Sequence, residues 1–254
     1  MSRPAPPLPA LVAARFAAAT VAVGTPGWWP AAELLCRDGR LAAAIAAERA
    51  ARGAPSDAVA GSLLVLEYSR MLGWPVLGGA VREGRWPDPD PAGVLLCGER
   101  GRVVRVGFPD ARPRDGDVGQ ALADVLDGHL DELVAAVHAG TRSPLRTLWS
   151  NVAAALAGAL LALSWTLPQR AGLAATTRSL LDAEPRLRGL VTVAVSAQGD
   201  EDWMRVVRNG CCLAFRCAAP HGHWCGTCPV LDDAERERRF QEAAARYRVL
   251  EAWA

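Results

Sequence analysis

Five of the seven cysteines of this 254-residue chain lie between positions 211 and 228. They form an adjacent pair, Cys211 and Cys212, then a single Cys217, then a C-x-x-C turn made by Cys225 and Cys228. Thiolates are metal ligands and, where disulfides form, cross-links. Because we expect no secretion signal at the N-terminus, this clustering favours metal binding in a reducing compartment over a disulfide scaffold.

The spacing of the two pairs indicates which metal they suit. The C-x-x-C turn lets two sulfurs converge on one ion. Side chains of adjacent residues diverge, so Cys211 and Cys212 reach a single tetrahedral ion only with a strained backbone. A [2Fe–2S] cluster needs four ligands shared between two irons, whereas structural zinc sites mostly use two spaced pairs. A cluster is the favoured interpretation, and zinc remains open through Cys212, His221 or His223, Cys225 and Cys228.

Two segments carry a family resemblance. The cysteine segment resembles the C-terminal signature of the FhuF-type ferric siderophore reductases, in which adjacent cysteines precede a ten-residue spacer and a C-x-x-C turn. The run Leu148-Trp-Ser-Asn-Val-Ala153 resembles the Leu-Trp-Gly-Asn-Val-Ala element of that family. The chain departs from the pattern in a spacer of twelve residues, in the extra Cys217 within it, and in Ser150, where the family often has glycine.

The resemblance implies a cofactor and a reaction. It implies a [2Fe–2S] cluster ligated by Cys211, Cys212, Cys225 and Cys228, with Cys217 as an alternate ligand and zinc as the alternative metal. It further implies an oxidoreductase that gives one electron to siderophore-bound Fe(III), of the hydroxamate class first, and releases Fe(II) in the cytoplasm. The location would be cytoplasmic, with peripheral contact to a membrane transporter at the inner face of the membrane.

Two other functions stay open at this point. One is a non-catalytic protein in which zinc or a cluster staples the C-terminal segment to the body. The other is a siderophore-binding accessory protein. No phosphate loop, dinucleotide motif or Ser-His-Asp arrangement is visible, so the electron would come from another protein or reductant. The net charge of +1 gives no reason to expect nucleic acid.

No catalytic residue is expected beyond the cluster, but five residues are candidates for binding substrate. Arginines beside the cysteines could attract an anionic complex, and Trp and Asn at a helix start could line its cavity. Each also has a structural interpretation, because all 28 basic residues are Arg and a buried Trp or Asn is more often scaffold. The candidates are Trp149, Asn151, Arg205, Arg208 and Arg216.

Other chemistry-bearing residues receive no role. His129 and His138 are nine residues apart, which places them on different faces of one helix. Cys36 and Cys97 lie in apolar stretches and are expected to be inert thiols.

The elements that must position the cysteines are mostly helical. Apolar periodicity and capping signals predict helices, and alternating apolar runs around a glycine turn predict one hairpin. The expected helices are 8–23, a stretch from Pro30 interrupted near Gly39, Ser56 to Met71 ended by Pro75, 118–137 closed by Gly140, one opening at Ser143-Pro144, 171–181, and one from Asp232-Asp233 with Phe240, Ala244, Tyr247 and Leu250 on one face. The expected strands are 94–97 and 103–108, and a β-like run at 190–195, with a rigid connector at 86–91.

The uncharged segment from Thr147 to Gln169 raises a membrane question. It contains polar residues and a proline, and its alanine-rich composition inserts weakly, so we predict a buried core helix. The predicted class is α+β: a mostly helical body with a small antiparallel sheet and a C-terminal iron–sulfur binding segment. The predicted division is 1–204 for the body, with a sub-boundary near 86–92, then 205–230 for the cluster segment and 231–254 for an amphipathic helix.

Overall fold

The computed structural model describes residues 19–36, 39–109, 113–218 and 224–252, the last without the side chains beyond Arg248. The described chain is mostly helical with small antiparallel sheets, so the predicted α+β class is confirmed. The helices are α2 (Ala32–Leu35), α3 (Leu41–Arg52), α4 (Asp57–Glu83), α5 (Val118–Val125), α6 (Asp131–Thr141), α7 (Leu145–Ser164), α8 (Ala174–Ala183) and α9 (Asp233–Ala252). The strands are β1 (Trp28–Pro30), β2 (Arg85–Trp86), β3 (Leu95–Glu99), β4 (Arg102–Gly107), β5 (Arg114–Asp115), β6 (Val191–Gln198) and β7 (Glu201–Arg208).

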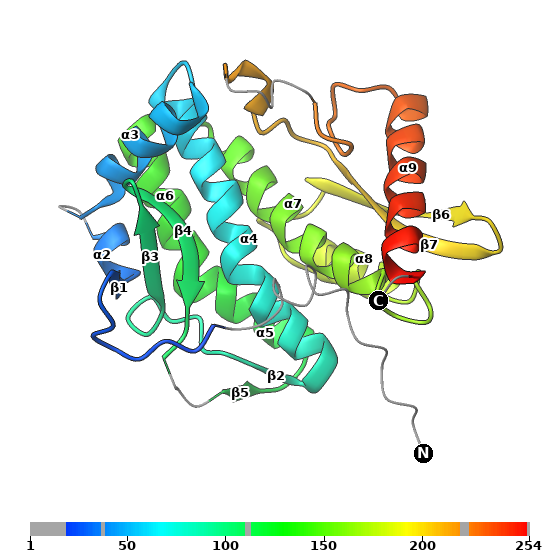
Figure 1. Ribbon diagram of the computed structural model, residues 1–254, viewed down its shortest axis with the longest axis horizontal. Coiled ribbons are helices and arrows are strands. Elements are labelled where there is room, and N and C mark those ends of the chain that lie inside the picture. The colour runs from blue at the N-terminus through cyan, green and yellow to red at the C-terminus, as the bar shows by residue number, and fades with distance from the viewer. Residues whose placement is uncertain (1–18, 37–38, 110–112, 219–223, 253–254) are drawn as a thin grey trace.

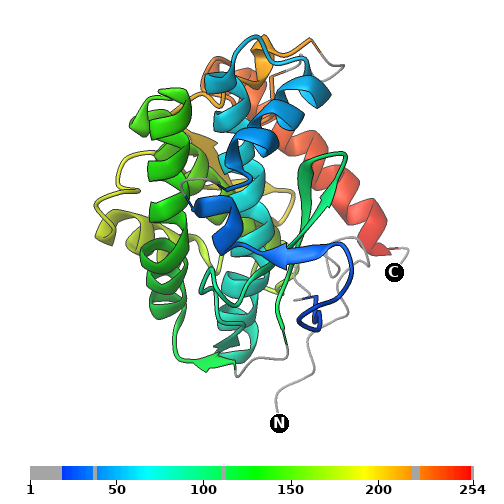
Figure 2. The ribbon, with the colours of Figure 1, turned by 90° about the vertical axis from the view of Figure 1, so that its left-hand side faces the viewer.

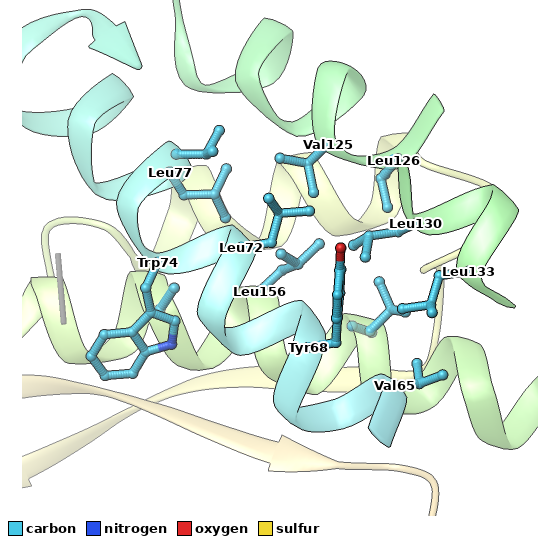
Figure 3. Close-up of a cluster of buried hydrophobic side chains, with 14 of the residues drawn as sticks. Val65, Tyr68, Leu72, Trp74, Leu77, Val125, Leu126, Leu130, Leu133 and Leu156 are labelled. Atoms are coloured by element: carbon cyan, nitrogen blue, oxygen red, sulfur yellow. The ribbon is translucent and has the colours of Figure 1, made fainter. Parts of the chain in front are cut away.

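Helices α4 and α7 run side by side through the centre of the molecule (Figure 1). Their close approach depends on Gly73, where a Cβ would lie 2.4 Å from the Cδ2 of Leu156. On the other side of α4, Tyr68 and Leu72 pack with apolar side chains of α5, of α6 and of the turn between them into a buried cluster (Figure 3). The two helices therefore form the core to which the other elements attach.

The start of α4 is predicted correctly and its end is not. The Ser56 side chain accepts a hydrogen bond from the N–H of Val59 at 3.4 Å, as a helix cap does. The helix then continues through Pro75 to Glu83. An interior proline costs about 3 kcal/mol, and here it is outweighed by burial of side chains on both flanks of α4, including Leu72 and Leu77.

The predicted long helix over 118–137 is divided by a π turn, Leu126–Leu130. Asp117 caps α5 with a capping box that includes Gln120. Beyond the π turn, α6 passes Gly140 and ends at Arg142, which has a φ of 59°. Gly140 is therefore not the terminator, because an arginine takes the left-handed position instead.

Two hairpins flank the helical core on opposite sides (Figures 1 and 2). The predicted hairpin is β3–β4, which β1 extends to three strands in the order β1-β3-β4, and β2 pairs separately with β5. The second hairpin, β6–β7, pairs Val191 with Arg208 through to Gln198 with Glu201. The sequence indicated part of β6 but missed β7, which packs on α7 and runs directly into the cysteine segment.

The predicted N-terminal helix falls mostly outside the described residues, and its described end is not helical. Thr20 bridges Phe108 in parallel fashion, and the N–H of Val21 donates to the carbonyl of Phe108 at 2.9 Å. The helix expected to reach Val23 is wrong for positions 19–23, because the edge of β4 supplies backbone partners there.

The C-terminal helix α9 is attached by aromatic side chains. Phe240, Ala244 and Tyr247 are buried on one face, as predicted, whereas Leu250 lies outside the described side chains. Trp165 packs edge-on against Phe240 at 5.7 Å and Tyr247 at 5.5 Å between ring centroids, and Trp203 joins the cluster.

The described chain contains one helix, α7, with the length and hydropathy to cross a membrane, and 67% of its apolar window is buried inside the structure. Its packing against α4 and β7 confirms the predicted core helix.

Candidate metal centre

The cysteine segment begins where β7 ends. The N–H of Arg208 donates to the carbonyl of Thr227 at 3.2 Å, which ties the end of the strand to the C-x-x-C turn. Gly210 then passes against α7 so closely that a Cβ would lie 2.2 Å from the Oγ of Ser150. The strand end, the turn and α7 together set where the cysteine pair lies.

The two cysteine pairs are separated by twelve residues in the sequence, and both line one cavity of about 350 Å³. Burial raises the pKa of the Cys228 thiol, and negative charge on the other three thiols raises it further. An effect of one thiolate on another weakens with distance, so it fits the placement of the four thiols around one cavity. The four residues are Cys211, Cys212, Cys225 and Cys228.

Hydrogen-bonding groups lie near three of these sulfurs. The N–H of Leu213 donates to the Sγ of Cys211 at 3.3 Å, and the backbone of Val230 gives Cys228 a hydrogen bond that lowers its pKa against the effect of burial. The Thr227 hydroxyl lies 3.5 Å from the Sγ of Cys225. Donors to sulfur of this kind stabilise metal-bound thiolates and tune cluster potentials.

The backbone itself adapts at the adjacent pair. Leu213 has a φ of 66°, a left-handed conformation that is unfavourable for a branched residue. The turn allows the Leu213 N–H to reach back to Cys211, and a short 3₁₀ helix, Ala214–Arg216, follows.

Cys217 lies beyond this turn and does not line the cavity. Burial raises the pKa of Cys217, Arg52 of α3 lowers it, and negative charge on Cys212 and on Glu48 of α3 raises it further. Its next residue, Ala218, donates its N–H to the carbonyl of Gly53 at 3.1 Å. Cys217 thus belongs to the contact between the segment and α3.

The ligand assignment itself stays a prediction. Among the described side chains, no three of His, Cys, Asp or Glu already stand at coordination distance. His221 and His223, the nitrogen ligands of the zinc alternative, lie outside the described residues.

A buried polar network connects the helical core to the cysteine pair. Asn151 on α7 donates through Nδ2 to the carbonyl of Ser62 at 2.7 Å and to its Oγ at 2.8 Å. Ser62 on α4 in turn donates to the carbonyl of Cys212 at 3.1 Å. The Oδ1 of Asn151 accepts a hydrogen bond from the guanidinium of Arg208. Asn151 therefore reaches Cys212 only through Ser62.

Arg208 is a buried cation on the wall of the thiol-lined cavity. It is 5% exposed, forms no ion pair with the described residues, and its Nε has no hydrogen-bond partner. A buried charge without a counter-charge is unfavourable by several kcal/mol, and neutral Asn151 supplies none. Metal-bound thiolates carry net negative charge, so the donor set and Arg208 together fit an anionic metal–thiolate centre.

The remaining predicted substrate residues lie elsewhere. Trp149 is half-buried under the guanidinium of Arg186 at 5.7 Å and does not line the cavity. Arg205 pairs with Glu237 of α9, and Arg216 is exposed at the end of the 3₁₀ helix.

Sequence reasoning missed the parts of the site that come from α4. Ser62 and Trp74 contribute to the network and the cavity wall, but both read as ordinary helix positions. Trp224, next to Cys225, also lines the cavity, and its place beside the C-x-x-C turn is the sequence signal for it.

Fold and site together define an α+β protein with a thiol-lined centre built on the end of a hairpin. A family model described as "Ferric iron reductase FhuF-like transporter" matches residues 62–194, and the chain belongs to this family. The match runs from Ser62 within α4 into β6, includes Asn151, and ends before the cysteine segment. No curated protein matches the chain. Membership supports a function related to ferric iron reduction in general.

Proposed function

We propose that the protein is a ferric siderophore reductase of the cytoplasm. Cys211, Cys212, Cys225 and Cys228 would hold a [2Fe–2S] cluster, and the substrate would be Fe(III) bound by a siderophore of the hydroxamate class. The observation that carries the proposal is the meeting of these four thiols with the buried, unpaired Arg208 on one cavity wall. Family membership supplies the ferric iron theme.

When bound, such a cluster supplies one electron at a time. The product would be Fe(II), which hard oxygen ligands hold less tightly than Fe(III), so reduction releases the metal from the siderophore. No covalent step by a side chain is needed.

The chain's own residues have three tasks in this reaction. Arg208 offsets the negative charge of the thiolates, and the N–H of Leu213 stabilises the sulfur of Cys211. Asn151 and Ser62 fix the backbone at Cys212. Cys225 is exposed whereas Cys212 and Cys228 are buried, so a substrate would approach from the Cys225 side.

The electron donor would be a separate protein or reductant. Peripheral contact with a membrane transporter would not involve the apolar face of α7, because that face is buried against α4 and β7.

One observation favours a second function. The hydrogen bonds from Asn151 to Ser62 and from Ser62 to Cys212 attach the cysteine segment to the helical core. Such attachment is expected of a protein whose metal only holds the C-terminal segment in place. A siderophore-binding accessory protein is the third candidate.

Two measurements separate the three. Protein purified without oxygen should be red-brown and contain iron and sulfide, whereas colourless protein with zinc alone would contradict the proposal. Reduced protein mixed with ferric siderophores in a stopped-flow instrument should be reoxidised. If no ferric complex reoxidises it, although binding is detected, the accessory role is supported instead.

A further inference from the structure

A second cavity adjoins the thiol-lined one. It has a volume of about 470 Å³ and lies between α4 and the strand β4. The two cavities share three wall residues of α4, Glu67, Arg70 and Trp74. Because they share this wall, we treat the two adjoining cavities as one cleft, which we call the α4 cleft. It leads from the cysteines to β4.

The α4 cleft has aromatic walls along its length. Trp74 points away from the core cluster of Tyr68 (Figure 3), and Trp28 of β1 lines the far cavity. At the cysteine end, Phe215 and Trp224 are each 42% exposed. Large exposed aromatic side chains beside a cavity are typical of ligand sites.

The charge of the cleft walls is positive. Arg52, Arg70 and Arg105 line it, against the single carboxylate of Glu67. Glu67 lies 3.3 Å from Arg70 and 3.6 Å from Arg52, so one carboxylate serves two guanidinium groups.

The other neighbouring charges do not cancel this excess. Glu48, which contacts Arg52, is also bound by Arg102 at 2.6 Å. Arg105 lies over the ring of Trp28 at 5.5 Å and forms no ion pair with the described residues. Arg208 is additional, but its charge is matched to the thiolates.

We propose that the α4 cleft binds the whole ferric siderophore, and that the preferred complex carries net negative charge. This inference rests on the proposed function and narrows its substrate. A hydroxamate chelate that also binds iron through carboxylates is anionic, whereas a simple trihydroxamate of Fe(III) is neutral or cationic. The iron lies at the cysteine end, and the remainder of the ligand extends past Arg70 toward Arg105 and Trp28. A cavity of about 350 Å³ alone is at the lower limit for a molecule of drug size.

Gallium complexes test binding without electron transfer, because Ga(III) has the size and charge of Fe(III) and is not reduced. Binding to the metal-loaded protein is measured by calorimetry for Ga(III) held by a citrate dihydroxamate and for Ga(III) held by a linear trihydroxamate. We expect the anionic complex to bind at least about tenfold more tightly at low salt, with the difference shrinking at high salt. Equal affinities for the two complexes would overturn the proposal.

Variants locate the ligand in the cleft. Arg70→Gln and Arg105→Gln should each weaken binding of the anionic complex about fivefold and should not weaken binding of the trihydroxamate complex. Trp28→Leu should weaken both. Arg85→Gln is the matched control, since Arg85 is exposed, pairs with Asp115 and lines neither cavity. If Arg105→Gln and Trp28→Leu bind like the wild type, the ligand does not extend along the cleft.

The outcome is separable from that of the proposed function. If the protein binds the anionic gallium complex more tightly but the iron complex does not reoxidise the cluster, the cleft proposal stands and the reductase proposal is rejected. Reoxidation by ferric complexes without charge preference would retain the reductase and remove this inference.

Discussion

Arg208 connects two features that are far apart in the sequence, the Asn151 motif on α7 and the cysteines. Its guanidinium bonds the amide oxygen of Asn151 while its backbone N–H bonds the C-x-x-C turn. In a chain whose basic residues are all arginine, nothing in the sequence distinguishes this one from its neighbours Arg205 and Arg216. Burial without an ion pair distinguishes it.

Replacing Arg208 should lower the reduction potential of the metal centre. Arg208→Gln removes a positive charge that stabilises the more negative reduced state, and we expect a decrease of about 60 mV or more, about 1.4 kcal/mol for one electron. Potentiometric titration followed by EPR measures it. Asn151→Asp, which would pair Arg208 internally, should act in the same direction. An unchanged potential in both variants would remove the role of Arg208 as counter-charge, and Arg216→Gln serves as the exposed control.

The cysteine substitutions should separate ligands from the bystander. Cys211→Ser, Cys225→Ser and Cys228→Ser should abolish the cluster absorption. Cys217→Ser should leave the absorption and EPR spectra unchanged, because Cys217 does not line the cavity that the other four cysteines share. Iron and sulfide content checks each variant. Loss of the cluster in Cys217→Ser together with its retention in Cys212→Ser would exchange these two residues.

At the scale of elements, the contact of α4 with α7 fixes the distance from Ser62 to Asn151, and therefore the position of Cys212. Glycine makes this contact possible at Gly73. Gly210, two residues after the end of β7, sets the position of the adjacent cysteine pair in a similar way. It passes close to α7, where Ser150 leaves no room for a side chain at position 210.

Gly73→Ala should destabilise the protein, because the new methyl group would lie 2.4 Å from Leu156 and force it to move. We expect the free energy of unfolding to fall by about 1–3 kcal/mol, measured by urea denaturation. Gly140→Ala is the control in α6, where nothing lies within 4 Å of the added Cβ. That variant should be neutral or stabilised by up to about 1 kcal/mol. If Gly140→Ala loses as much stability as Gly73→Ala, replacing a helix glycine by alanine is unfavourable here for a reason other than the contact with Leu156.

For the whole molecule, the connection between α4, the π turn and the 86–91 connector depends on His129. Its Nδ1–H donates to the carbonyl of Pro89 at 2.7 Å, so its Nε2 accepts the hydroxyl of Tyr68 at 2.5 Å. No sequence pattern assigns His129 a role. The π turn is what directs it inward.

Burial lowers the pKa of His129 to about 4, against a hydrogen bond to Pro89 that raises it. The unfolded chain takes up this proton near pH 6.5 and the folded protein near pH 4, so stability is complete above about pH 6.5 and decreases as the pH falls toward 4. The loss amounts to about 3 kcal/mol. Urea titrations across this range measure it.

The contribution should vanish in His129→Gln, whose stability would be lower at pH 7.5 but less dependent on pH. His138→Gln is the control on α6. If His129→Gln shows the wild-type pH profile, another group causes the loss.

The sequence by itself determined the local features: the cap at Ser56, the β3–β4 hairpin, the apolar face of α9 and the clustering of thiols. Each depends on residues close together in the chain, where periodicity, capping and turn chemistry act. The division into 1–204, 205–230 and 231–254 stays a prediction, as do the cluster and its ligands.

Only the tertiary structure decided the rest, because its causes are contacts between distant residues. Packing around Leu72 and Leu77 carries α4 through Pro75, where local preference would have ended it. Pairing with β6 makes a strand of β7, and the approach of α7 buries Arg208 beside the thiols. The cysteine spacing indicated a metal, but the buried charge and the α4 cleft beside it depend on how α4, α7 and β7 meet.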